Sequence, residues 1–153
     1  MSKTYIQNEC AKILGEKPSS KEYALAASWI LAHFKGINLK IYDMNNTSSL
    51  CDYNILASVE NTVQAKAMVD ELMYNLKQAG LTMISLEGGN DSDWILLDLG
   101  DIIVHLIHDM SRDVYDLDDL WKDLEQVEIP QEYYFGEGQE KLEGSKSDTE
   151  NYF

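Results

Sequence analysis

The chain has 153 residues, of which 44% are hydrophobic and 25% charged, a composition typical of one globular domain. Its 27 acidic residues outnumber 12 basic ones and give a formal net charge of -15. Because phosphates and anionic lipid heads repel an acidic surface, neither sequence-specific nucleic-acid binding nor membrane binding is expected. A basic protein surface is the favoured partner.

Cys10 and Cys51 are the two cysteines, and their separation is not typical of a metal site. The chain does not begin with a basic segment followed by an apolar one, the pattern of a secretory signal. We therefore expect two reduced thiols in a cytoplasmic protein.

The N-terminal part of the chain predicts two helices. Residues 1–18 carry apolar side chains at helical spacing, and Pro18 closes the segment, which we expect to be an appendage helix. Ser19 and Glu22 then match a capping box, in which both side chains accept hydrogen bonds from N–H groups at the helix start. The apolar stripe that follows ends before Gly36 and predicts a second helix.

The middle of the chain predicts strands around one long helix. Alternating apolar and polar residues over 37–42 indicate a half-buried strand, and further strands are expected over 53–58 and 81–86. The helix between them begins at residue 61 or 62 and ends before Gly80. Its inner side is expected to hold Val63, Met68, Leu72 and Leu76.

Two later apolar runs predict a β-hairpin. Trp94–Asp98 is joined to Asp101–Ile107 by Leu99 and Gly100, a two-residue connection that contains glycine. The order α-β-β-α-β-β-β-α then predicts an α/β (α+β) domain, in which helices pack on a mixed five-stranded sheet.

The end of the chain is strongly acidic. A short helix is expected after Asp109, with an apolar face made by Leu117, Leu120, Trp121 and Leu124. The acidic residues between 109 and 128 indicate either a solvated helix face or a docking surface for basic residues. Beyond Gln126 apolar periodicity is lost, and seven acidic residues stand against two basic ones. We therefore expect an appendage helix (1–18), one ordered domain (19–125) and an acidic flexible tail (126–153).

Metal and cofactor chemistry has weak support in the residues, and we expect neither group. His105 and His108 are three apart on a predicted strand, so their side chains point to opposite faces. Residues 88–93 lack the Lys-Ser/Thr of a phosphate loop. Asp91 and Asp93 could hold divalent ions only if they projected from one face of a strand, and a metal-dependent nucleotidyl or phosphoryl transferase is the alternative function.

The hairpin offers a candidate interface. Leu99 occupies the predicted turn, where side chains project into solvent, and Trp94 lies at the open end of the same strand. A large aromatic beside an exposed leucine, with carboxylates around them, is typical of an interface anchor. The carboxylates would be Asp91, Asp93, Asp98 and Asp101. Alternatively, Trp94 folds back onto the core and Leu99 is an isolated surface residue.

Several sequence blocks match one family together. They are Gly36–Asp43, Ser48–Tyr53 (SSLCDY), Gln64–Ala67 (QAKA), Glu87–Gly88, Trp94–His105 (WILLDLGDIIVH), and Arg112, Tyr115, Leu117, Leu120 and Trp121. In this order and spacing they resemble the Iojap family, the bacterial ribosomal silencing factors, across roughly residues 20–121. The chain departs from the family pattern at 59–64, which lacks the usual Gly-x-Ser-x-Arg-Gln, and at Asn54, where an aromatic residue is usual.

The resemblance implies a nucleotidyltransferase-like core without catalytic residues and a function without enzymatic activity. It implies a factor that binds the large ribosomal subunit at large-subunit protein fourteen and blocks joining of the small subunit. Translation would thereby be repressed when nutrients are limiting. The family's contact residues carry over to Trp94 and Leu99, the pair selected above on physical grounds. A homodimer is compatible with this function.

Overall fold

The computed structural model describes residues 3–47, 50–89 and 91–134. The sheet is mixed and five-stranded, in the order β1-β2-β5-β4-β3, which confirms the predicted fold class. Its strands are β1 (Ile37–Asp43), β2 (Tyr53–Val59), β3 (Ser85–Glu87), β4 (Trp94–Asp98) and β5 (Ile102–His108). At the centre β2 and β5 are parallel, and the other neighbouring strands are antiparallel.

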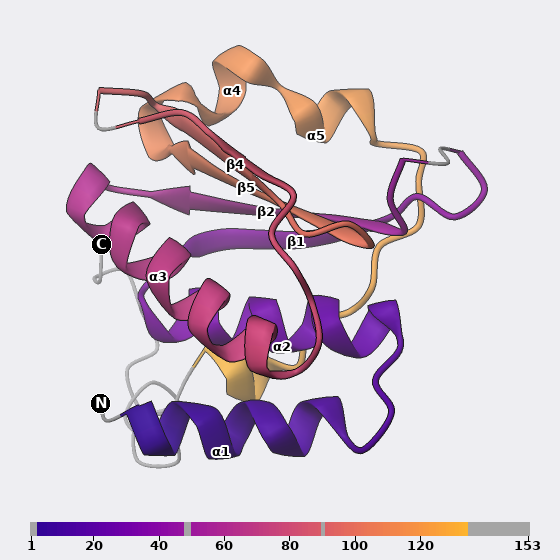
Figure 1. The fold of residues 1–153 in the computed structure, drawn as a ribbon. Helices are drawn as coiled ribbons and strands as arrows, with labels where there is room; N and C mark the ends of the chain where they lie inside the picture. The colour runs from indigo at the N-terminus through magenta and orange to yellow at the C-terminus, as the bar shows by residue number, and fades with distance from the viewer. Residues whose placement is uncertain (1–2, 48–49, 90, 135–153) are drawn as a thin grey trace, which may run out of the picture.

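Helices cover the two faces of the sheet unequally (Figure 1). On one face lie α2 (Ser20–His33) and α3 (Thr62–Gln78), with α1 (Lys3–Leu14) packed on their outer side. The other face is covered by three short helical segments: η1 (Asp109–Ser111), α4 (Arg112–Tyr115) and α5 (Leu117–Leu120). Because successive side chains of a strand point to opposite faces, each face has its own apolar cluster.

Local sequence signals determine where the long helices begin and end. The Ser19 N–H donates to Glu22 Oε1 at 2.7 Å, which confirms the capping box of α2. Asn61 Oδ1 accepts a hydrogen bond from the Gln64 N–H at 2.8 Å and caps α3. Gly80 follows α3 with a φ of +110°, a conformation that favours glycine. These boundaries agree with the sequence prediction.

The N-terminal helix α1 is part of the core, and the prediction of an appendage is wrong. Its inner residues Ile6, Cys10 and Leu14 are buried in one apolar cluster with residues of α2, of α3 and of the sheet face that these two helices cover. The amphipathic pattern predicted the helix correctly. It could not show that α2 has an outer side left for α1 to cover.

The chain also remains packed on the body beyond Gln126. The Val127 N–H donates to the Ile41 carbonyl at 2.9 Å, and Gln126 forms a bridge with Tyr42. A 3₁₀ turn, η2 (Gln131–Tyr133), follows, and apolar residues of this segment pack against the main cluster. The predicted tail boundary is therefore wrong for residues 126–134, and the rest of the predicted tail lies outside the described residues.

Three smaller predictions also differ from the structure. Val63 is exposed, because five helical positions separate it from Met68 and place it about 140° around the helix from that buried residue. The strand expected over 81–86 is confined to β3. Leu120 points to solvent, whereas Leu117, Trp121 and Leu124 pack on the sheet as predicted.

Loss of the α1 contact should destabilise the whole domain. We expect Ile6→Ala to lower the free energy of unfolding by about 3 kcal/mol, because it leaves a cavity in the main cluster. Val63→Ala is the control and should change it by less than about 0.5 kcal/mol, since Val63 is exposed. Urea denaturation of both variants measures the difference, and equal values would contradict a core role for α1.

Candidate functional site

The turn between β4 and β5 is one residue later than predicted. The Leu99 N–H donates to the Ile102 carbonyl at 3.0 Å, so Gly100 and Asp101 are the two central turn residues. Gly100 has a φ of +91°, which fits the first central position of a type II′ turn and favours glycine there. The structure therefore corrects the expected turn at Leu99 and Gly100.

This shift reverses the direction of the Leu99 side chain. A strand has a period of two, so Leu99 points to the same face as Leu97, the face covered by α2 and α3. Both residues belong to the main core. Leu99 is 3% exposed, and the prediction that it projects into solvent is wrong. Trp94, an odd number of positions away, lies on the opposite face of the sheet.

The six predicted interface residues divide into two groups at the ends of β4. Asp91, Asp93 and Trp94 lie at one end, and Asp98, Leu99 and Asp101 at the other. Four strand positions separate Trp94 from Asp98, about 14 Å at the usual rise per residue. Asp98 Oδ1 accepts a hydrogen bond from the Gly100 N–H at 2.9 Å, so this carboxylate stabilises the turn. The side chain of Asp101 is exposed.

Trp94 is half-buried in a small aromatic cluster above the sheet. Its ring centroid lies 4.6 Å from that of Tyr115 on α4 and 5.9 Å from that of His105 on β5. Its indole N–H donates to His105 Nδ1 at 3.2 Å. The indole is therefore held at its N–H edge and remains partly open to solvent. It is neither a fully exposed anchor nor a side chain folded back into the core, the two alternatives predicted from the sequence.

Asp93 connects this cluster to the segment after β5. Ser111 Oγ donates to Asp93 Oδ2 at 2.6 Å, and the Tyr115 hydroxyl donates to Asp93 Oδ1 at 2.7 Å. The hydrogen bond from Ser111 and then that from Tyr115 are the main causes that lower the pKa of Asp93. The carboxylate thus positions the Tyr115 ring against Trp94.

The transferase alternative required Asp91 and Asp93 to project from one face of a strand. Both residues lie in the loop before β4, and both oxygens of Asp93 accept internal hydrogen bonds. Within residues 3–47, 50–89 and 91–134, no three or more His, Cys, Asp or Glu side chains are grouped so that they could hold a metal ion. The arrangement does not support a metal-carrying pair.

Two exposed apolar side chains lie in the same segment as Tyr115. Met110 is 81% exposed and Val114 is 77% exposed, and each is next in sequence to a residue that binds Asp93. The carboxylates Asp109, Asp113, Asp116 and Asp119 of the same segment are also exposed. We call Trp94, Tyr115, Met110 and Val114 the Trp94 surface. Sequence reasoning missed Met110 and Val114, although both are apolar residues within an acidic run.

An ion pair between buried Arg112 and partly buried Asp118 holds α4 and α5 on the sheet. Arg112, itself buried, donates through Nε to Asp118 Oδ2 and through Nη1 to Ser58 Oγ on β2, both at 2.8 Å. The Tyr42 hydroxyl on β1 donates to Asp118 Oδ1 at 2.8 Å. Burial raises the pKa of Asp118, but the hydrogen bonds from Arg112 and Tyr42 and the charges of Arg112 and Lys40 outweigh it and lower the pKa to about 2.

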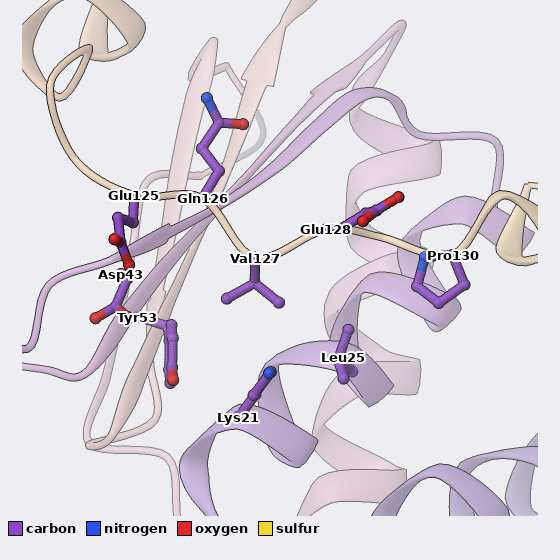
Figure 2. A pocket seen from close by; sticks show the side chains of 9 residues that line it. All are labelled: Lys21, Leu25, Asp43, Tyr53, Glu125, Gln126, Val127, Glu128 and Pro130. Carbon is purple, nitrogen blue, oxygen red and sulfur yellow. The ribbon is translucent and has the colours of Figure 1, made fainter.

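A pocket of about 360 Å³ lies away from this surface, between α2 and the segment after α5. Figure 2 shows that segment crossing in front of the ends of β1 and β2, with Val127 pointing toward α2. The pocket is lined by Lys21, Leu25, Asp43, Tyr53, Glu125, Gln126, Val127, Glu128 and Pro130. One lysine among carboxylates and apolar groups does not define a ligand.

A family model described as ribosomal silencing factor during starvation (RsfS) matches residues 17–152. The chain belongs to the RsfS family. This confirms the resemblance recognised in the sequence, and a plant relative, the mitochondrial Iojap-related protein of Arabidopsis thaliana, is 27% identical over 96 residues, 60% of this chain and 52% of that protein. Helix α1 precedes the part that matches the RsfS model.

RsfS proteins of several bacteria are similar to this chain. The RsfS of Haemophilus influenzae is 37% identical over 87 residues, which cover 57% of this chain and 85% of that protein. The RsfS of Chromobacterium violaceum is 32% identical over 101 residues, 66% of this chain and 83% of that protein. A crystal structure of a Chromobacterium violaceum protein has a TM-score of 0.64 and 29% identity, and the match covers 74% of this chain and 91% of that one.

The Arg112–Asp118 pair should make a measurable contribution to stability. We expect Asp118→Asn to lower the free energy of unfolding by about 3 kcal/mol at neutral pH, because it leaves the buried Arg112 charge without its partner. Asp119→Asn is the control: Asp119 is an exposed neighbour 3.6 Å from Lys122, and its loss should cost less than about 1 kcal/mol. Urea denaturation provides the comparison.

The same pair predicts a pH dependence. The folded-state pKa of Asp118 lies below its value of about 3.9 in an unfolded chain, so the unfolded state binds more protons between the two values. This contribution is present above pH about 4 and is lost as pH falls toward about 2. The free energy of unfolding should fall more steeply over this range in the wild-type protein than in Asp118→Asn, and parallel curves would contradict the prediction.

Proposed function

We propose that this protein is a translational repressor without enzymatic activity that acts in the cytoplasm. It binds the large ribosomal subunit through large-subunit protein fourteen and blocks joining of the small subunit when nutrients are limiting. The observation that carries the proposal is membership of the RsfS family, whose bacterial relatives are named ribosomal silencing factors. No helix among the described residues is long and apolar enough to cross a membrane.

The Trp94 surface supports a protein partner. Trp94 and Tyr115 contact each other and stay partly exposed, and exposed apolar side chains on a folded domain indicate an interaction site. Tryptophan and tyrosine contribute strongly to binding when a partner desolvates them. Exposed carboxylates of the same segment suit a basic partner such as a ribosomal protein, because opposite charges accelerate the encounter. Asp91 and Asp101 are exposed and contribute to this attraction.

The other predicted contact residues take supporting roles in this proposal. Leu99 lies in the core beneath the turn, so it stabilises the hairpin rather than meeting the partner. Asp98 closes the turn, and Asp93 positions Tyr115. A homodimer stays compatible with this function, and light scattering would test it.

Removal of the Trp94 side chain should weaken binding to the large subunit. We expect Trp94→Ala to raise the dissociation constant at least about 30-fold, which corresponds to about 2 kcal/mol. Co-sedimentation with purified large subunits measures this value. The wild-type protein should travel with large subunits and not with joined ribosomes, and sedimentation with joined ribosomes would contradict occlusion of the small subunit.

Val114 and Val63 offer a matched test of the same surface. They are 77% and 78% exposed, and Val63 lies on α3, on the other side of the sheet. We expect Val114→Ser to weaken large-subunit binding by about fivefold and Val63→Ser to leave it unchanged, because only Val114 lies on the Trp94 surface. If Trp94→Ala and Val114→Ser both bind as the wild-type protein does, the partner meets another face.

A further inference from the structure

His105 is a buried histidine beside the exposed surface. It lies on β5, directly opposite Leu96 of β4 and Leu56 of β2, on the face covered by α4 and α5. Trp121 packs on it in an edge-to-face arrangement, with ring centroids 5.8 Å apart. Its two ring nitrogens each have one hydrogen-bond partner, Trp94 on one side and Asn54 on the other.

The partners determine which ring nitrogen of His105 carries the proton. An indole N–H can only donate, so His105 Nδ1, 3.2 Å from Trp94 Nε1, must be the unprotonated acceptor. In a neutral imidazole the proton then resides on Nε2, which lies 2.8 Å from Asn54 Oδ1 and donates to it. Burial lowers the pKa of His105 to about 4, so the ring is neutral at physiological pH.

Asn54 stabilises one of the two neutral forms of His105. It is 5% exposed on β2, a strand whose other residues are mostly apolar, and a buried amide is costly unless it is hydrogen-bonded. Its carbonyl oxygen stabilises the Nε2–H form of His105, and that form presents a lone pair to Trp94. Without this acceptor, His105 could move its proton to Nδ1, and the indole would lose its partner.

We infer that Asn54 and His105 are positioning residues that orient the Trp94 indole for partner binding. This inference rests on the proposed function, in which Trp94 meets the partner. Tyr115 restrains the indole at its ring and His105 restrains it at its N–H edge, so the side chain is ordered before binding. An ordered side chain loses less conformational entropy when the partner binds, which raises affinity.

The tautomer of His105 in the wild-type protein provides the first test. In protein labelled with ¹⁵N-histidine, NMR distinguishes a protonated ring nitrogen from an unprotonated one. We expect His105 to carry its proton on Nε2 at neutral pH, with the signal assigned by its loss in His105→Gln. Protonation on Nδ1 would overturn the inference, and the ring is observed in the wild-type protein, so His105→Gln serves only for the assignment.

Asn54→Leu is the second test, and Asn75→Leu is its matched control. Asn75 is 4% exposed on α3, on the other side of the sheet, and makes no hydrogen bond to this cluster. We expect Asn54→Leu to shift the Trp94 indole N–H signal, assigned by its loss in Trp94→Phe, and to weaken large-subunit binding about threefold to tenfold. Asn75→Leu should leave the indole signal and the binding unchanged.

The outcomes separate this inference from the proposed function. An unchanged indole signal in Asn54→Leu would overturn the positioning role. Wild-type affinity of Asn54→Leu for the large subunit would also overturn it, provided that Trp94→Ala binds more weakly. Failure of the wild-type protein to bind large subunits would instead overturn the proposed function. The NMR measurements use the free protein, so they test the hydrogen bonds among Asn54, His105 and Trp94 whether or not the protein binds large subunits.

Discussion

The Trp94 surface depends on the Arg112–Asp118 ion pair. Segments α4 and α5 are each only four residues long, too short to be stable alone, and the pair ties them to β1 and β2 through Tyr42 and Ser58. Tyr115 and Val114 lie on the segment so held. Because the Arg112 charge is buried, removal of its partner Asp118 is costly.

The two faces of the sheet serve different purposes. The face covered by α2 and α3 carries the larger apolar cluster, and α1 together with the residues after Gln126 extends it. The opposite side has a smaller cluster and a buried polar layer that includes Asn54, His105 and Arg112. Buried polar groups must be paired in defined geometry, so this face can hold a surface side chain such as Trp94 in one orientation.

The acidity predicted from composition is divided in the structure between two roles. Asp93, Asp98 and Asp118 accept internal hydrogen bonds and so determine local geometry. Other carboxylates of the hairpin and of α4 and α5 are exposed and create the negative field around the Trp94 surface. Sequence counts alone treat these groups as equivalent, because a carboxylate's role depends on the donors that lie near it.

The sequence by itself determined the boundaries of α2 and α3, four of the five strands and the mixed sheet, because capping residues, glycine stops and apolar periodicity act over a few residues. It also pointed to Trp94 as a candidate contact residue. Only the tertiary structure decided the burial of Leu99, since a one-residue shift of the turn reverses a strand side chain. The core role of α1 and the contacts among Asn54, His105 and Trp94 likewise join residues far apart in the chain, and only folding brings them together.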